Sequence, residues 1–216
     1  MPVLKKEILD LYQEHGLLTH LYIKIKLKIC PFIRMESFFP NKGKIIDLGC
    51  GNGLFPNILK LRSNAREIIG FDLDEKKIRA AKKTEKDRPG LEFRRGNIIE
   101  EDYPRGDVFS LIDVLYLIPY KKQKIILRKC SSALSAGGIL IIKEMDTKPL
   151  WKYLWNQVQE TFAVKIVGLT LGERFYFRSR KEFQDILTDL GFKIKSVRLD
   201  TGYWYPHIIY VCKKLG

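Results

Sequence analysis

One segment constrains the fold more than any other: an apolar run that contains an acid and passes straight into a glycine-rich turn. It reads Ile45-Ile46-Asp47-Leu48-Gly49-Cys50-Gly51-Asn52-Gly53-Leu54-Phe55. The apolar start is typical of a short buried strand, and a helix is expected after the turn. Glycines allow positive φ and let a ligand approach the bare backbone. The segment therefore predicts the strand–turn–helix unit of an open α/β sheet, with a ligand at the turn.

From residue 44 onward, apolar runs alternate with segments that have helical spacing. The runs are short, rich in Ile, Val, Leu or Phe, and bounded by Gly, Pro, Asn or Asp. They are Lys44–Leu48, Glu67–Phe71, Leu91–Arg94, Val108–Val114 and Gly138–Lys143. Strands that alternate with helices through short loops predict a mainly parallel sheet covered on both faces.

The regular alternation of apolar runs and helical segments ends after the fifth run. Residues 147–180 are unusually aromatic, and a helix is expected over Lys181–Leu190 with Gly191 as its cap. Two further apolar runs, Lys193–Leu199 and His207–Cys212, are close enough in sequence to form a hairpin. The last strand is therefore expected to run antiparallel to its neighbour, which makes the sheet mixed.

The turn also restricts the ligand. A nicotinamide-binding turn reads Gly-x-Gly-x-x-Gly, but Leu54 occupies the position of the third glycine. Asp47 lies two residues before the first glycine, where its carboxylate would repel a pyrophosphate and favour a cation. The turn is expected to bind a positively charged cofactor that lacks phosphates.

The string DLGCGNG resembles motif I of class I S-adenosylmethionine-dependent methyltransferases. Four further segments resemble the family's motifs in the same order: Asp72 at the end of the second strand, Gly96-Asn97-Ile98 where the family has Gly-Asp, Asp113-Val114-Leu115-Tyr116 at motif IV, and Ser135–Leu140 at the Gly-Gly turn. The resemblance covers about residues 44–146 and, at the level of topology, the C-terminal hairpin.

The resemblance implies a Rossmann-like, doubly wound α/β fold whose seven-stranded mixed sheet has an antiparallel last strand, with S-adenosylmethionine as cofactor. It implies that the two carboxylate oxygens of Asp72 hold the ribose hydroxyls. The implied cofactor-binding residues are Asp47, Gly49, Cys50, Gly51, Gly53, Asp72, Leu73, Asn97, Ile98 and Asp113. By location alone, the catalytic candidates are Asp113, Tyr116, Tyr176 and His207.

Several of these residues also have purely structural interpretations. Asp74 is expected to cap the helix that follows it, and Gly137 and Gly138 to form a tight turn. Asn97 suits a turn as well as an adenine contact. His207 suits a packed or solvated histidine as well as a general base.

Residues 1–43 are expected to form a basic and apolar extension to a methyltransferase domain of residues 44–216. Ile23–Ile29 alternates with period two, which is a strand signature with one lysine face. Wound as a helix, it has two apolar stripes separated by Lys24 and Lys28, which suits a helix lying on another protein or a membrane. The helix is favoured because further residues fit one helical face: Leu18, Leu21, Tyr22, Ile25 and Ile29.

The chain is strongly basic, with 39 Lys and Arg against 25 Asp and Glu and a formal net charge of +14 in 216 residues. Such a surface attracts nucleic acid or anionic lipid, although a lysine-rich proteome would produce the same excess. The sequence leaves the oligomeric state open.

The cysteines bear on metal binding and compartment. Four scattered cysteines without a Cys-x-x-Cys pair, beside three histidines, predict neither a disulfide framework nor a metal site. The start is not signal-like and no apolar run is long enough to cross a bilayer. The expected location is the cytoplasm, with peripheral contact at the inner face of the membrane as an alternative.

The aromatic insertion at 147–180 lies where family members carry a lid over the substrate. Trp151, Trp155 and Phe162 are expected to form an apolar pocket. The side chains expected to hold an anionic group are Arg174, Arg178 and Arg180. The expected reaction is methyl transfer to a small, partly apolar or lipid-like acceptor with an anionic group, and the chain resembles small stand-alone bacterial methyltransferases.

Two alternatives stay open. Basic side chains interleaved with aromatics also suit an RNA or DNA methyltransferase, although motif IV lacks the Asp/Asn-Pro-Pro-Tyr/Phe string of enzymes that methylate base amino groups. In the other alternative the domain binds the cofactor but acts as a non-catalytic partner subunit. The intact Asp47, glycine turn and Asp72 argue against it.

Overall fold

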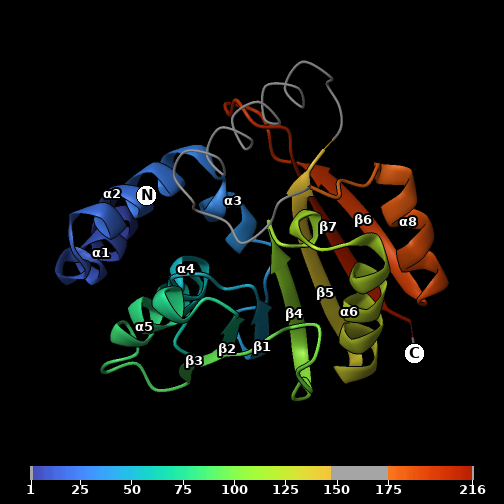
Figure 1. The fold of residues 1–216 in the computed structure, drawn as a ribbon, viewed down its shortest axis with the longest axis horizontal. Helices are drawn as coiled ribbons and strands as arrows, with labels where there is room; N and C mark the ends of the chain where they lie inside the picture. Colours follow the sequence, from blue (N-terminus) through green and yellow to red (C-terminus); the bar gives the residue numbers. More distant parts are fainter. Residues whose placement is uncertain (1, 147–174, 216) are drawn as a thin grey trace.

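The computed structural model describes residues 2–146 and 175–215. At its centre is a seven-stranded sheet in the order β3-β2-β1-β4-β5-β7-β6 (Figure 1). The strands are β1 (Gly43–Leu48), β2 (Arg66–Asp72), β3 (Leu91–Arg95), β4 (Gly106–Ile112), β5 (Leu134–Met145), β6 (Phe192–Arg198) and β7 (His207–Lys214). β7 runs antiparallel to both β5 and β6, and the other neighbours are parallel. The predicted mixed sheet with an antiparallel last strand is confirmed.

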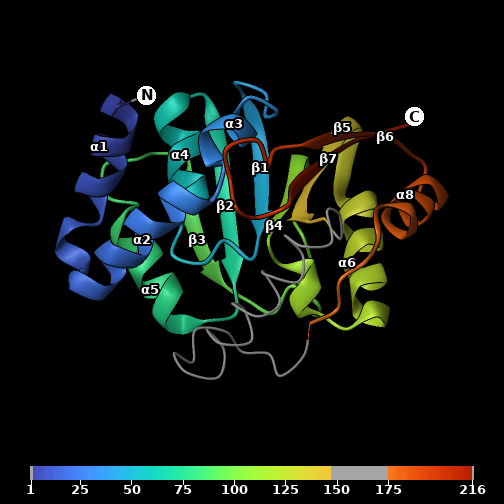
Figure 2. The same cartoon turned by 90° about the horizontal axis from the view of Figure 1, so that it is seen from above.

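Helices cover both faces of the sheet (Figure 2). One face carries α1 (Pro2–Leu11), α2 (Leu17–Ile29), α3 (Phe32–Glu36), α4 (Leu54–Arg62) and α5 (Glu75–Lys83), and the other carries α6 (Tyr120–Ala133) and α8 (Arg180–Asp189). The short 3-10 helices are η1 (Gln13–His15) and η2 (Leu115–Leu117). Because side chains alternate along a strand, Ile45 joins the first core and Ile46 the second.

The predicted tight turn at Gly137 and Gly138 takes the form of a bend inside β5, where the step from Leu134 to Ile139 faces the step from Gly106 to Val108 of β4. β5 begins at Leu134, directly after α6, and both glycines lie within it. Gly137 has a φ of +71°, and the pairing of β5 with β4 changes register between Gly106 and Val108. A Cβ on Gly138 would lie 2.8 Å from the Leu134 side chain, so the glycines allow an irregularity inside the strand.

The N-terminal extension packs into the same core as the sheet. Leu4, Ile8 and Tyr12 of the N-terminal segment share this core with Ile45 and Ile68. The predicted helix over residues 23–29 is confirmed as the C-terminal half of α2. Within residues 2–146 and 175–215, no helix combines the length and apolar character of a membrane span.

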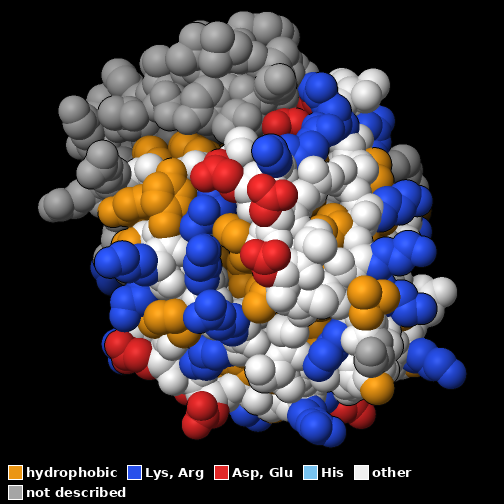
Figure 3. Space-filling view, turned by 90° about the vertical axis from the view of Figure 1, so that its right-hand side faces the viewer, with side chains coloured by type: hydrophobic (Ala, Val, Ile, Leu, Met, Phe, Trp, Pro, Cys, Tyr) orange, Lys and Arg blue, Asp and Glu red, His pale blue; other side chains and the backbone are white. Residues whose placement is uncertain are grey.

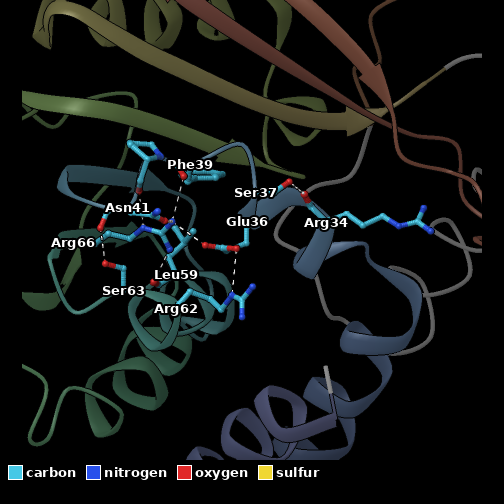
Figure 4. Close-up of polar contacts among 10 residues, drawn as sticks. Arg34, Glu36, Ser37, Phe39, Asn41, Leu59, Arg62, Ser63 and Arg66 are labelled. Atoms are coloured by element: carbon cyan, nitrogen blue, oxygen red, sulfur yellow. Dashed lines mark hydrogen bonds and ion pairs between the residues drawn. The ribbon is translucent and has the colours of Figure 1, made fainter.

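A buried arginine ties this extension to the sheet (Figure 4). Arg66, at the start of β2, is fully buried, and its guanidinium donates to Glu36 Oε1 at 2.8 Å. It also donates to the carbonyls of Pro40 at 2.8 Å and Leu59 at 2.7 Å. Glu36 also pairs with Arg62, whose side chain is half exposed. The carboxylate of Glu36 therefore joins α3 to both α4 and β2.

We expect Arg66→Met to lower the free energy of unfolding by about 3 kcal/mol, because it removes the fully buried cation from the Glu36 carboxylate and leaves it the half-exposed Arg62. Arg62→Met removes the exposed partner of the same carboxylate and should cost less than about 1 kcal/mol. Urea denaturation of both variants measures the difference. Equal losses would contradict the assignment of the stability to the buried pair.

Candidate functional site

The glycine turn between β1 and α4 is held against the end of β2. The N–H groups of Gly49 and Cys50 donate to the Phe71 carbonyl at 2.7 and 2.9 Å. The N–H of Gly51 donates to Asp72 Oδ2 at 2.8 Å. Gly49, Gly51 and Gly53 all have positive φ, between +56° and +83°, which explains why glycines are needed there. The topology thus brings the predicted motif I and Asp72 together.

The site fits a cofactor that carries a ribose. A Cβ built on Gly51 meets nothing within 4 Å, so its backbone borders open space. Each oxygen of Asp72 accepts one backbone bond, from Gly51 and from the Asp74 N–H, and a carboxylate oxygen can accept a second. Leu73 is half exposed beside it and offers an apolar surface. Asp74 caps α5, as predicted, by accepting from two N–H groups.

Asp47 is the buried acid of the site. It is 2% exposed, and the Ser110 hydroxyl donates to its carboxylate. Burial raises the pKa of Asp47 to about 7, against the Ser110 hydrogen bond that lowers it, and the negative charge of Asp72 adds to the rise. A cationic ligand at the turn would stabilise the ionised form, since opposite charges lower a carboxyl pKa.

This raised pKa predicts a pH-dependent stability. Between about pH 4 and pH 7 the folded protein retains the Asp47 proton that the unfolded chain releases, so stability falls as pH rises through this window. The slope contributed by Asp47 is at most about 1.4 kcal/mol per pH unit. Asp47→Asn should remove this contribution in denaturation curves taken across the window. Asp185→Asn, an exposed change on α8, should keep the wild-type slope; equal slopes in all three proteins would refute the prediction.

A polar network that was not predicted from the sequence supports the glycine turn. The Tyr12 hydroxyl donates to the Asn52 carbonyl at 2.9 Å. The Asn57 amide donates to the Tyr12 hydroxyl, to the Gly53 carbonyl at 2.8 Å and to Thr84 Oγ1 at 2.8 Å. The available signal was Asn57, an amide within an otherwise apolar helix segment. Tyr12 carried none, because its partner lies 40 residues away.

The segment predicted to contact adenine is built as a turn. Asn97 Oδ1 accepts from the Ile99 N–H at 3.1 Å, and its carbonyl accepts from the N–H groups of Glu100 and Glu101. This geometry favours the turn interpretation of Asn97. Ile98 is buried, and its carbonyl accepts from the Tyr103 hydroxyl.

Asp113 lies just beyond β4, which ends at Ile112 and not at Val114 as predicted. Its φ of +57° is left-handed, which a strand residue does not adopt. The carboxylate forms an ion pair with the fully buried Lys143 ammonium. Burial opposes ionisation of Asp113, but the positive charges of Lys143 and Lys26 outweigh it and leave the pKa of Asp113 below its usual value. Asp113 is therefore an ionised, weakly basic carboxylate.

His207 opens β7 opposite Met145, at the same edge of the sheet as Asp113. It is 2% exposed, and its Nε2 lies 2.9 Å from the Ile29 carbonyl, so Nε2 is the donor. Burial lowers the pKa of His207 to about 3, with Lys143 adding to the effect. A buried, neutral imidazole that is engaged with α2 favours the packed interpretation over the general base.

Tyr116 lies in η2 and is nearly buried. Its ring stacks on Phe177 at 5.1 Å and contacts Phe175 at 5.8 Å between centroids. The Tyr116 carbonyl accepts from the Tyr176 N–H at 2.7 Å. Two predicted catalytic candidates, Tyr116 and Tyr176, are thus brought together through the backbone, while the Tyr176 ring packs edge-on against the Tyr120 ring at 5.4 Å.

Two buried polar side chains that were not predicted from the sequence position η2. The Gln123 amide donates to the carbonyls of Leu115 and Ile118. Glu144 Oε1 accepts from the Leu115 N–H at 3.0 Å. Burial, together with the charge of Asp113, raises the pKa of Glu144 to about 8. Glu144 carried a signal, because it is an acid at the end of an apolar run, whereas Gln123 lies among lysines and carried none.

Two of the arginines predicted to hold an anionic group have partners within the protein. The Arg178 side chain is 8% exposed and donates to Gln123 Oε1 at 2.6 Å, while its guanidinium lies over the Tyr120 ring. Arg180 pairs with the buried Asp146 at 2.7 Å. Both guanidinium groups are engaged in holding the segment before α8. The other residues predicted for the lid, Trp151, Trp155, Phe162 and Arg174, lie outside the described residues.

The sheet order, the glycine turn and the acids at two neighbouring strand ends define a class I S-adenosylmethionine-dependent methyltransferase domain. Residues 40–189 match the family model described as a methyltransferase domain. The match spans more than half of the chain, which therefore belongs to this family. The family resemblance predicted from the sequence is confirmed.

Solved structures share the fold. Magnesium protoporphyrin IX methyltransferase from Synechocystis PCC 6803, with bound SAH, has a TM-score of 0.70 at 18% identity, covering 95% of this chain and 92% of that one. Human N-acetylserotonin methyltransferase in complex with SAM has a TM-score of 0.69 at 18% identity, covering 98% of this chain and 57% of that one. At these identities the likeness shows the fold alone.

Curated relatives match over part of their length. A carboxy-S-adenosyl-L-methionine synthase of Sulfurimonas denitrificans is 29% identical over 126 residues, 57% of this chain and 53% of that protein. A demethylspheroidene O-methyltransferase of Rhodobacter capsulatus is 30% identical over 153 residues, 69% of this chain and 36% of that protein. The chain spans about half the length of the first curated relatives that it matches.

Proposed function

We propose that this protein transfers a methyl group from S-adenosylmethionine to a small, partly apolar or lipid-like acceptor. The observation that carries the proposal is the glycine turn closed against Asp72, with the buried Asp47 beneath it. The family membership and the ligands of the two structural neighbours, SAH and SAM, support the cofactor.

Residues of this chain would contact the ribose, the adenine, the methionine part and the positive charge of the donor. Asp72 would hold the ribose hydroxyls, and Leu73 would contact the adenine ring. The N–H groups and bare Cα atoms of the turn would border the methionine part. When bound, S-adenosylmethionine supplies a methyl group on a positively charged sulfur. Asp47 would stabilise that positive charge in the ground state, so its role is in binding.

The acceptor side is argued from the aromatic cluster around Tyr116. The rings of Tyr116, Phe175 and Phe177 pack together beyond the end of β4. Tyr116 follows Asp113 by three residues in the sequence. Aromatic walls bury apolar acceptors and exclude water. The names of three relatives point the same way, since eugenol, trans-aconitate and demethylspheroidene are small molecules.

Alignment of the nucleophile with the donor methyl is the chain's main catalytic task. The ionised Asp113 and the neutral, buried His207 are both poor bases. This favours an acceptor atom that loses its proton readily or carries none. Tyr116 and Tyr176 remain the candidates for a group that touches the acceptor.

The nucleic-acid alternative gains little from the face formed by α6 and α8. On the face formed by α6 and α8, Lys and Arg side chains are spread out with Asp and Glu between them (Figure 3). A phosphate-tracking groove gathers basic side chains into a continuous strip. The small-molecule acceptor is therefore the preferred proposal.

The proposal is tested by methyl transfer from labelled S-adenosylmethionine into a fractionated cell extract. We expect label in the lipid or small-metabolite fraction, and none with Asp72→Ala. Label in RNA would support the nucleic-acid alternative instead. Cofactor binding without transfer into any fraction would support the non-catalytic partner subunit.

Some of the relatives are carboxy-S-adenosyl-L-methionine synthases. Mass spectrometry of the cofactor after the reaction distinguishes methyl transfer from the reaction that their name describes. Methyl transfer leaves S-adenosylhomocysteine. A cofactor that is heavier by one carboxyl group, with no methylated product, would contradict methyl transfer and identify the chain with those relatives.

A further inference from the structure

The outward face of α2 is apolar although it is exposed. Leu17 and Leu18 are 81% and 83% exposed, and Leu21 and Ile25 are 50% and 48% exposed. At 100° per residue these four side chains fall on one side of the helix. The opposite side carries Ile23 and Leu27, which are buried in the core. The two apolar stripes predicted from the sequence are thus one buried face and one exposed face.

The charges on α2 itself have a single sign. Lys24 and Lys28 are exposed. At 100° per residue, Lys24 borders the exposed stripe, and Lys28 falls within its width, about two turns beyond Leu21. From Leu17 to Met35 the chain carries Lys24, Lys26, Lys28 and Arg34 and no acidic residue. An exposed apolar stripe with one lysine at its border and another at its C-terminal end suits a helix that lies in a membrane interface, with its apolar side chains among the lipid chains and its lysines at the headgroups.

We propose that α2 docks the protein on an anionic lipid bilayer, through Leu17, Leu18, Leu21 and Ile25, with Lys24 and Lys28 on the headgroups. A second copy of this chain is a poorer occupant, because it would bring the same positive charges to the contact. Anionic headgroups neutralise these charges. The inference goes beyond the proposed function and does not depend on it.

The C-terminal end of α2 lies close to the functional site. Ile29 at the end of α2 accepts a hydrogen bond from His207, and Lys26 acts electrostatically on Asp113. Both of these residues lie at the sheet edge that carries the site. A bilayer held by α2, at the margin of the molecule (Figure 1), would therefore lie near the acceptor side of the site. A lipid-like acceptor then needs no transfer through water.

Vesicle flotation tests the proposal with vesicles of phosphatidylcholine alone and of phosphatidylcholine mixed with phosphatidylglycerol. We expect the wild-type protein to float with the anionic vesicles at low salt and to stay behind with the neutral ones. Lys24→Gln/Lys28→Gln should weaken the partition about 30-fold, from about 1 kcal/mol per lysine at an anionic surface. Its control, Lys121→Gln/Lys124→Gln, removes the same charge from exposed positions of α6, on the other face of the sheet, and should float like wild type.

The apolar contribution is tested by Leu18→Gln, which changes an exposed side chain and should lower flotation by at least about fivefold. Leu215→Gln removes another exposed leucine, 58% exposed near the C-terminus, and should have no effect. The proposal is overturned if the wild-type protein does not float, or if the α6 control loses flotation equally. It is also overturned if gel filtration shows a dimer that Leu18→Gln dissociates. Donor binding measured on the same variants keeps this test separate from that of the proposed function.

Discussion

Asp72→Ala should abolish measurable binding of S-adenosylmethionine, with a dissociation constant at least about 100-fold weaker than wild type. The reason is the loss of two hydrogen bonds from the ribose hydroxyls to a charged acceptor, at about 1.5 kcal/mol or more each. The variant also releases the Gly51 N–H, which donates to Asp72 and fixes the glycine turn. Isothermal titration calorimetry measures the loss directly. Asp72→Asn keeps one carbonyl acceptor, so its dissociation constant should lie between those of the wild type and Asp72→Ala.

The matched control is Asp74→Ala, two residues along the chain. Asp74 accepts from the N–H groups of Lys76 and Lys77 and caps α5. Its loss should cost about 1 kcal/mol of stability and leave donor binding unchanged. If both variants lose binding alike, the effect comes from the start of α5. If Asp72→Ala binds as tightly as wild type, the role assigned to Asp72 is wrong.

The fold and the donor side of the site were predictable because they depend on local sequence. Gly49, Gly51 and Gly53 need positive φ whatever surrounds them, and strand–helix alternation fixes a parallel sheet. Parallel strands then bring Asp47 and Asp72 to the same edge without any knowledge of packing. The antiparallel last strand followed from the short separation between β6 and β7.

The acceptor side was not predictable to the same degree, because it depends on which long side chains meet across the fold. Arg178 turns to Gln123, 55 residues away, and Arg180 to Asp146, 34 residues away. Lys143 has the sequence context of an ordinary strand residue, yet it is fully buried. Pairings over such separations leave no periodic signal, so free cations and engaged cations look alike in the sequence.

Breaking the ion pair of Lys143 with Asp113 should cause a large loss of stability. Lys143→Met should lower the free energy of unfolding by about 4 kcal/mol, because it leaves the nearly buried Asp113 carboxylate without its closest cation. For a chain of this size we expect a fall in Tm of roughly 10 °C. Differential scanning calorimetry measures the Tm, and urea denaturation measures the free energy.

A double-mutant cycle separates the ion pair from the packing of the lysine stem. Asp113→Asn alone leaves Lys143 as an unpaired buried cation and should also destabilise strongly, whereas Lys143→Met/Asp113→Asn removes both charges and should recover most of the loss. Additive losses in the cycle would show that the pair contributes no coupling.

The pH dependence of stability adds an independent check, since the pKa of Asp113 lies below its usual value. The stabilisation by Asp113 is present above about pH 4 and is lost as pH falls through the folded pKa. In Lys143→Met this acid-side loss should be smaller than in wild type, because the cation that lowers the carboxyl pKa is gone.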